Sequence, residues 1–257
     1  MVPVTSPDSH DGTIEQRSYS AARSFGSHTA EYERGRPTYP AELVAWLVPD
    51  GATTVVDVGA GTGKLTAALV APGRTVVAVD PDAQMLAALR GRLPDVETRE
   101  GTGEALPFTD ASVDALTFGQ SWHWVDPVRG SLEAARVLRP GGALGLVWNI
   151  RDERVAWVAE LSAVMHHSAA ERLVHDGGPR VADPLGPLET REVAWESRMS
   201  VEDVVAMAAS RSYVITAEPD RRARILDTVR VLAGSVVEAD GLVRLPYVSY
   251  AYRATAG

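Results

Sequence analysis

The segment from Thr54 to Leu69, TVVDVGAGTGKLTAAL, constrains the fold of this chain more than any other. Its first five residues form a short apolar run rich in β-branched side chains, which predicts a buried strand. Gly59, Gly61 and Gly63 follow at alternate positions, and leucines and alanines then recur at helical spacing. Glycines tolerate unusual backbone angles and let N–H groups approach a ligand, and the start of a helix favours negative charge. The segment therefore predicts a strand, a ligand-binding turn and a helix.

The spacing of the glycines in this turn distinguishes between the classes of cofactor that such turns bind. A dinucleotide fingerprint needs glycine at the first, third and sixth positions, but the sixth position from Gly59 is Lys64. A phosphate-binding Walker loop fails at both ends, where Val58 and Leu65 stand. What remains is Asp57 followed by glycine at every second place. In this the chain resembles the class I S-adenosylmethionine-dependent methyltransferases, whose first motif has this pattern; a tight turn without a ligand is the structural alternative.

A second apolar run, Thr75 to Val79, ends at Asp80, 19 residues beyond the central glycine of the turn. A carboxylate at the end of this strand can accept hydrogen bonds from ribose hydroxyls in the related dinucleotide fold. The resemblance gives Asp80 that role and implies that Pro81 and Met85 lie near adenine. Alternatively, Asp80 caps the helix expected from Ala83 to Leu93.

The sequence GTGEALPF, from Gly101 to Phe108, departs from the pattern that it resembles. Family members often carry an aspartate that bonds the adenine amino group where this chain has Thr102. The resemblance therefore implies that backbone groups at Gly103 and Glu104 read the ring edge instead.

The strand expected from Ala115 to Phe118 runs into GQSWHWVD, and ligands in open α/β sheets bind beyond such strand ends. The resemblance makes Gln120 and Ser121 neighbours of the cofactor. His123 is a candidate general base, because neutral imidazole can remove a proton near physiological pH. The alternative is that His123 is a structural residue between two tryptophans.

A helix from Arg129 to Leu138, a Pro-Gly-Gly turn and a strand from Ala143 to Trp148 follow. The turn is another frequent feature of the resembled family. Arg151, just beyond the strand, either orients an anionic substrate or pairs with Asp152.

The N-terminal part divides into a mobile tail, residues 1–17, and an aromatic, arginine-rich stretch that ends in a helix from Ala41 to Val48. The resemblance implies a lid in which Tyr32, Arg36 and Tyr39 close over the methionine end of the cofactor. The alternative is that these aromatic residues pack on the domain.

The C-terminal part is less informative. It predicts an amphipathic helix from Val155 to Ala170, with the adjacent His166 and His167 pointing apart on it. Strands are expected from Arg191 to Met199 and from Leu242 to Tyr252.

Charge and composition narrow the function. The chain carries 34 acidic and 25 basic residues, a net charge of −9, which disfavours nucleic acid as a partner. It has no cysteine, which excludes disulfides and thiolate chemistry. No apolar run approaches the about 20 residues that span a bilayer, and the N-terminus lacks a secretory pattern, so we expect a cytoplasmic protein without membrane contact.

Together these features predict an α/β fold: a doubly wound, mostly parallel, Rossmann-like sheet of seven strands, its last strand antiparallel, with an N-terminal helical lid. We expect one domain over residues 18–257, divided into a lid (18–48), a cofactor-binding core (50–152) and substrate-side elements (153–257). The resemblance implies methyl transfer from S-adenosylmethionine to a hydroxyl or carboxylate of a small molecule, without a metal; a homodimer is left open. A non-methylating protein of the same fold and a dinucleotide oxidoreductase are the alternatives.

The predicted catalytic residue is His123. The predicted cofactor-binding residues are Tyr32, Arg36, Tyr39, Asp57, Gly59, Ala60, Gly61, Gly63, Asp80, Pro81, Met85, Gly103, Glu104, Gln120 and Ser121.

Overall fold

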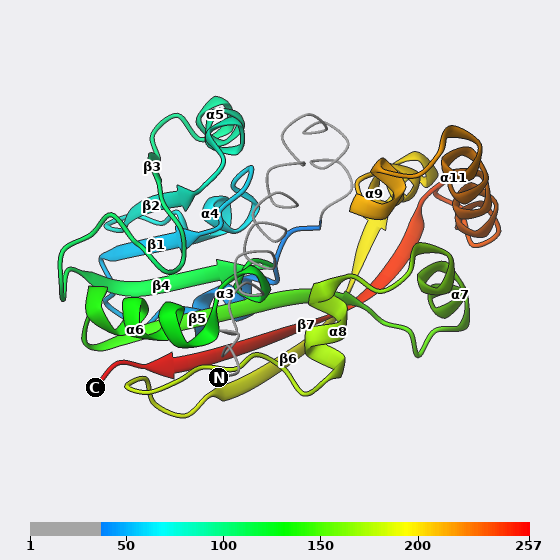
Figure 1. Ribbon diagram of the computed structural model, residues 1–257. Helices are drawn as coiled ribbons and strands as arrows, with labels where there is room; N and C mark the ends of the chain where they lie inside the picture. The colour runs from blue at the N-terminus through cyan, green and yellow to red at the C-terminus, as the bar shows by residue number, and fades with distance from the viewer. Residues whose placement is uncertain (1–36) are drawn as a thin grey trace, which may run out of the picture.

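The computed structural model describes residues 37–257 and contains a seven-stranded sheet of order β3-β2-β1-β4-β5-β7-β6 (Figure 1). All neighbouring strands pair in parallel except β7, which is antiparallel to both β5 and β6. The doubly wound sheet with an antiparallel last strand is therefore confirmed. The strands are β1 (Thr54–Val58), β2 (Thr75–Asp80), β3 (Glu97–Glu100), β4 (Val113–Gly119), β5 (Leu138–Arg151), β6 (Glu189–Met199) and β7 (Val243–Thr255).

Strand β1 lies where the strand order reverses, between β2 and β4. Its valines are buried on both faces of the sheet, which explains its continuous run of β-branched residues. In open parallel sheets, ligands bind beyond the carboxyl ends of the strands at such a reversal. We therefore expect ligand-binding residues in the segments that follow β1, β2 and β4.

Helices cover both faces of the sheet. On one face α3 and α4 pack against Val55 and Val147, and on the other α6 and α8 enclose Val56 and Trp148. These two layers bury the apolar residues that alternate along the strands. The helices are α3 (Ala41–Leu47), α4 (Lys64–Leu69), α5 (Ala83–Arg92), α6 (Pro127–Val137), α7 (Ala156–Met165), α8 (Ala169–His175), α9 (Val201–Ala209), α10 (Ser212–Ile215) and α11 (Pro219–Gly234), with a 3₁₀ turn η2 (Trp122–Trp124).

A separate apolar cluster lies at the far end of β6 and β7. Helices α7, α9 and α11 pack there around Val243, Leu245 and Tyr247. Figure 1 shows β6 and β7 continuing past the other strands to reach these helices. The start of α11, together with α8 and α10, lies across from the ends of β1 and β2 and borders the site described below.

Three details differ from the expectations. Strand β3, with the sequence Glu-Thr-Arg-Glu, was not foreseen because it lacks an apolar run. Strand β5 begins earlier, at Leu138, and ends later, at Arg151. The single helix expected from Val155 to Ala170 is two helices: His166 has a φ of +48° after α7, and Ser168 and Glu171 form a capping box that starts α8.

The predicted lid falls largely outside the described residues. Within the described part, α3 packs Leu43 and Leu47 into the core, where both are fully buried. Tyr32 and Arg36 lie outside residues 37–257, so a closing lid stays a prediction. Each helix within that range is too short or too polar to cross a bilayer.

Candidate functional site

The glycine turn after β1 is held in a conformation that side chains rarely adopt. Gly59, Gly61 and Gly63 have φ values of +66°, +56° and +88°. A Cβ at Gly59 would lie 2.5 Å from the Cβ of Ser121, so a side chain there would collide with the end of β4. Gly63 precedes the first residue of α4, and a Cβ there would lie 2.9 Å from Leu89. The turn therefore brings its backbone close to β4 and to α5.

Asp80 connects the end of β2 to this turn. Its Oδ2 accepts a hydrogen bond from the Gly61 N–H at 2.8 Å, and its Oδ1 accepts one from the Asp82 N–H at 2.8 Å. Burial raises the pKa of Asp80, and these two hydrogen bonds act in the opposite direction. Asp82, not Asp80, caps α5, because its side chain accepts from the Gln84 N–H. The helix-cap alternative for Asp80 is therefore wrong.

Asp57 lies within β1 and is almost completely buried. Its carboxylate accepts a hydrogen bond from Thr66 Oγ1 at 2.6 Å. Burial raises the pKa of Asp57 to about 7, although the hydrogen bonds from Thr66 and Thr117 act to lower it. A carboxyl group with such a pKa gains stability in its ionised form when a cationic group binds beside it.

The segment after β4 carries three further predicted residues. Ser121 Oγ donates to the Val58 carbonyl at 2.7 Å, and Gln120 Nε2 donates to the Asn149 carbonyl at 3.0 Å. His123 lies on η2, where its Nδ1 is 3.4 Å from the Trp148 Nε1–H and accepts a hydrogen bond. A neutral imidazole that accepts at Nδ1 carries its hydrogen on Nε2. In this arrangement the ring of His123 is thus a hydrogen-bond donor at Nε2.

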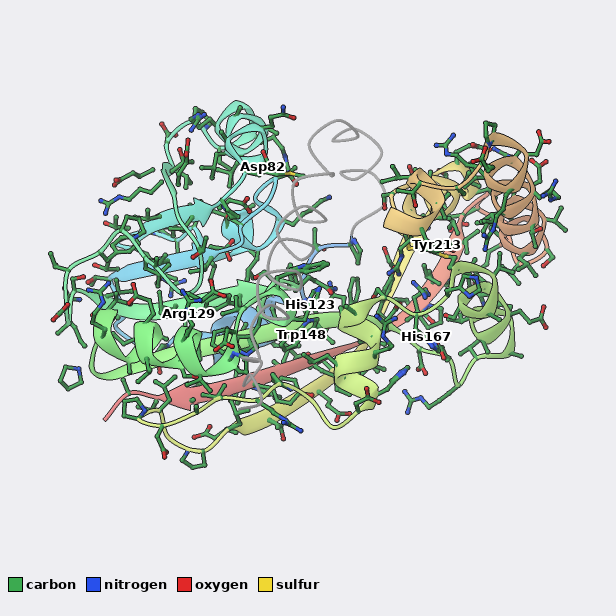
Figure 2. All side chains as sticks on the ribbon, viewed as in Figure 1. Asp82, His123, Arg129, Trp148, His167 and Tyr213 are labelled. Atoms are coloured by element: carbon green, nitrogen blue, oxygen red, sulfur yellow. The ribbon has the colours of Figure 1, made fainter. Side chains whose placement is uncertain are left out.

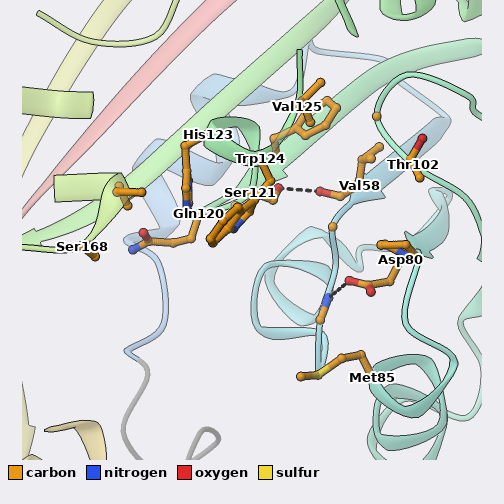
Figure 3. Close-up of a pocket in the computed structure, with 18 of the residues that line it drawn as sticks. Val58, Asp80, Met85, Thr102, Gln120, Ser121, His123, Trp124, Val125 and Ser168 are labelled. Atoms are coloured by element: carbon orange, nitrogen blue, oxygen red, sulfur yellow. Dashed lines mark hydrogen bonds between the residues drawn. The ribbon is translucent and has the colours of Figure 1, made fainter. Parts of the chain in front are cut away.

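A cavity of about 620 Å³ extends from the glycine turn to α8 and α10. Figure 3 shows Asp80 and Met85 on one side of it, the segment after β4 in the middle, and Ser168 on the opposite side. The volume is in the range of small-molecule sites. Most of the predicted residues line it together: Gly59, Gly61, Asp80, Pro81, Met85, Gly103, Glu104, Gln120, Ser121 and His123.

The other predicted residues are distributed differently. Tyr39, Asp57 and Ala60 line a smaller hollow of about 40 Å³ that shares Gly59, Gly61 and Gln120 with the large cavity. Gly63 lines neither of these two spaces. Glu104 lines the cavity, and its carboxylate accepts a hydrogen bond from the Asp126 N–H at 2.9 Å.

One wall of the cavity was missed by sequence reasoning. It comes from the junction of α7 and α8, from α10 and from the start of α11. These residues are too far apart along the chain for any local motif to reveal them. They include His166, His167, Ser168, Arg172, Arg211, Tyr213 and Arg221.

Arg151 does not line this cavity, although it was considered for substrate contact. Its side chain is buried, with Nη2 2.7 Å from Glu171 Oε1 and Nε donating to Ser162 Oγ at 3.0 Å. Asp152, the partner considered for it, instead binds the Arg154 side chain at 2.7 Å. Arg151 is thus part of a buried ion pair.

Comparisons with known proteins agree with this geometry. A sequence model of the family described as "Methyltransferase domain" matches residues 56–146, which run from β1 into β5. An uncharacterized methyltransferase of Mycobacterium tuberculosis is 46% identical over 240 residues, 90% of this chain and 95% of that protein. The chain belongs to the class I S-adenosylmethionine-dependent methyltransferases.

Further methyltransferase relatives and solved structures share the core. An uncharacterized methyltransferase of Schizosaccharomyces pombe is 38% identical over 148 residues, 56% of this chain and 59% of that protein. A solved structure from Anaeromyxobacter dehalogenans, provisionally assigned as a type II methyltransferase, has a TM-score of 0.57 at 24% identity, over 86% of this chain and 97% of that one. The YcgJ protein of Bacillus subtilis has a TM-score of 0.50 at 17% identity, over 84% and 97%. At these identities the solved structures establish the fold.

The methyl donor of this methyltransferase family is S-adenosylmethionine, and the residues of the site fit such a group. Gly59 has no room for a Cβ, which would collide with Ser121, so the turn keeps a bare backbone beside the cavity. The buried carboxylate of Asp80 lines the same cavity, where it can accept from a diol. Within residues 37–257, no cluster of three histidines or carboxylates is arranged to hold a metal ion.

Proposed function

We propose that this methyltransferase moves a methyl group from S-adenosylmethionine to an oxygen, a hydroxyl or a carboxylate, of a small molecule. The observation that carries the proposal is the single cavity that joins the glycine turn, Asp80 and His123. A donor bound at the turn and an acceptor bound beside His123 would share this space. Holding both reactants in one enclosed site supplies much of the rate acceleration in such reactions.

On the donor side, we assign the ribose hydroxyls to Asp80 and the adenine to the neighbourhood of Pro81 and Met85. All three line the same end of the cavity. The smaller hollow beside Asp57 and Tyr39 suits the amino-acid end of the donor, since a cationic ammonium favours the ionised form of a buried carboxylate. The roles of Tyr32 and Arg36 in closing over that end extend the same proposal.

When bound, the donor would supply a methyl carbon attached to a sulfonium sulfur. A lone pair of the acceptor oxygen would form the new bond to this carbon, and the electron pair of the carbon–sulfur bond would return to sulfur. The chain's own residues orient the acceptor and exclude water. A hydroxyl acceptor must lose a proton, and His123 is the candidate base. Because Nδ1 of His123 accepts from Trp148, taking up a proton at Nδ1 would break that hydrogen bond. A carboxylate acceptor needs no base, and the Nε2–H of His123 would then donate to its oxygen.

Calorimetry and product analysis test this proposal in sequence. We expect S-adenosylmethionine and S-adenosylhomocysteine to bind the purified chain in isothermal titration, and NADH not to bind. Incubation with metabolite extracts should then yield a product heavier by one methylene group. Base hydrolysis separates the two acceptors, because a methyl ester is cleaved and a methyl ether is not. Binding without a methylated product in broad extracts would favour a non-methylating protein of this fold.

Other parts of the proposal concern partners and location. A small-molecule acceptor is proposed in place of nucleic acid, and the cytoplasm is proposed as the location. Sedimentation measures whether the chain forms a homodimer. A gel-shift experiment with RNA and DNA tests whether nucleic acid is a partner. Retardation of either near physiological salt would contradict the proposal of a small-molecule acceptor.

A further inference from the structure

The charged residues that line the large cavity are separated by sign. The carboxylates of Asp80 and Glu104 lie at the end near the glycine turn. The arginines Arg172, Arg211 and Arg221 come from α8 and from the α10 and α11 region at the opposite end. Among the described residues that line this cavity, no carboxylate accompanies the three arginines. This separation occurs in a chain whose net charge is −9, so it does not follow from overall composition.

Arg211, one of the three lining arginines, shares a carboxylate with the buried Arg151. Arg211 Nη2 lies 3.1 Å from Glu171 Oε1, and Arg151 Nη2 lies 2.7 Å from the same oxygen. One buried carboxylate therefore pairs with two guanidinium groups. Arg172 adds a further guanidinium group, whose Nη1 donates to the backbone carbonyl of His167 at 2.6 Å rather than to a carboxylate. A positive charge in a partly enclosed site attracts an anion more strongly than it would in open water.

Tyr213 shows that these charges lie near one another. Burial raises the pKa of its hydroxyl, whereas Arg211, Arg151 and Arg221 act to lower it and Glu171 acts to raise it. Its hydroxyl donates to the Val164 carbonyl at 3.2 Å. Figure 2 shows Tyr213 and His167 on the side of the molecule opposite Asp82, with His123 between the two sides. The arginines are thus separated from the donor end by the segment that carries His123.

Other titratable groups near this wall have contacts of their own or lie outside the cavity. His167 Nε2 lies 2.9 Å from Glu153 Oε1, so any charge on this imidazole has its own partner. His166 packs its ring against Tyr213 at 5.2 Å between centroids. Glu218 and Asp220 are exposed near the start of α11 and do not line the cavity, whereas Arg221 does. Among the described residues, the three arginines are thus the charged side chains that this wall presents to the cavity.

We propose that the acceptor is a small organic anion whose carboxylate or phosphate group binds Arg172, Arg211 and Arg221 at the end of the cavity away from Asp80. This inference deepens the proposed function and depends on it, because it assigns the acceptor half of the same site. Arginine suits such a group, since its planar fork donates to two oxygens at once. The arrangement selects against neutral acceptors, which would leave the arginines without their anion.

The test measures anion binding directly. The full chain, saturated with S-adenosylhomocysteine, is titrated with succinate, citrate and inorganic phosphate in a chloride buffer at constant ionic strength. The variant is Arg172→Gln/Arg221→Gln, which changes two exposed side chains and spares the Arg211–Glu171 pair. Arg224→Gln, on the same helix α11 but away from the cavity, is the matched control. Succinamide, which has the shape of succinate without its charge, is the ligand control.

We expect at least one of the anions to bind the parent chain and Arg224→Gln alike, and to bind the double variant roughly ten- to hundredfold more weakly. The relative affinity of carboxylates and phosphate then identifies the anionic group. Anion affinity equal to that of succinamide, or equal affinity in the parent and the double variant, would overturn the inference.

S-adenosylhomocysteine affinity, measured separately, distinguishes this inference from the proposed function. If the double variant loses cofactor affinity and keeps anion affinity, the arginines belong to the donor site and the inference is wrong. If no chain binds S-adenosylhomocysteine, the proposed function itself fails, whatever the anions do.

Discussion

The Asp80 carboxylate accepts a hydrogen bond from the Gly61 backbone N–H at 2.8 Å, which joins the end of β2 to the turn after β1. The same carboxylate lines the large cavity. One side chain therefore both fixes the glycine turn and faces the proposed donor. This arrangement is an effective way to shape a site, because the group that binds the ligand also orders the backbone beside it.

Substitution of Asp80 tests that double role. We expect Asp80→Ala to weaken binding of S-adenosylhomocysteine by about 1–3 kcal/mol, through loss of the acceptor for ribose and of the bond to Gly61. Titration calorimetry measures the change. Asp82→Ala is the control: it removes the cap of α5 and lowers stability by about 1 kcal/mol, with cofactor affinity unchanged. Equal affinities in Asp80→Ala and the parent would remove Asp80 from the site.

Asp57 makes the stability of the unliganded chain depend on pH. Its folded pKa of about 7 is higher than the ordinary value of 3.8, so the folded state binds the proton more tightly than the unfolded state. Stability from this group is present below about pH 4 and is lost as pH rises towards 7, at up to about 1.4 kcal/mol per pH unit. We expect the Asp57→Asn variant not to lose stability in this way as the pH rises. Urea unfolding across that range gives the comparison, and parallel stability curves would contradict the assignment.

Glu171 makes a different contribution, because it compensates Arg151 and Arg211. Burial would raise its pKa, but Arg211, Arg151 and the bonds from Ser168 hold that pKa well below its usual range. Its stabilising effect is therefore present above about pH 4.5 and declines as pH falls below that value. We expect Glu171→Gln to destabilise the chain by about 3–5 kcal/mol at neutral pH, since the buried Arg151 loses its charged partner.

The control for Glu171 is Glu153→Gln, which removes a partly exposed carboxylate that pairs with His167. It should cost about 1 kcal/mol or less. Urea unfolding measures both variants. Similar losses in the two would show that the buried cluster contributes no more than a surface pair.

His123 is tested by turnover once a substrate is known. We expect His123→Ala to lower kcat by roughly 10²–10⁴-fold if the ring transfers a proton. Trp124→Phe, which changes a neighbouring ring in the same cavity, should leave kcat within a factor of a few. If His123→Ala also stays within that factor, His123 is a wall residue, and a carboxylate acceptor that needs no base becomes the better explanation.

The end of the cavity at the glycine turn could be predicted from the sequence, because its information is local. The glycine turn, Asp80 and the segment from Gln120 to His123 each follow a recognisable strand directly. Strand β3 could not be predicted, since Glu-Thr-Arg-Glu has neither an apolar run nor alternation. The break at His166 was also missed, because the apolar periodicity of Val155 to Ala170 continues across it.

The arginine-lined end of the cavity could not be predicted, for another physical reason. Arg172, Arg211 and Arg221 are separated by up to about fifty residues and meet only because α8, α10 and α11 border one cavity. In the sequence they are ordinary arginines on helices, indistinguishable from Arg224. Their position along the border of one cavity, which depends on tertiary packing, is what sets them apart.

The overhang of β6 and β7 beyond the rest of the sheet has a consequence for how such an enzyme can change. The helices at that end pack around their own apolar cluster, separate from the two clusters that enclose β1 and β4. A graft that exchanges α7, α9 and α11 for the equivalent helices of another methyltransferase would leave α8 and the helices that pack on β1 and β4 in place. The part of the cavity wall that α11 contributes can therefore be exchanged as one structural unit, without a change to the glycine turn after β1.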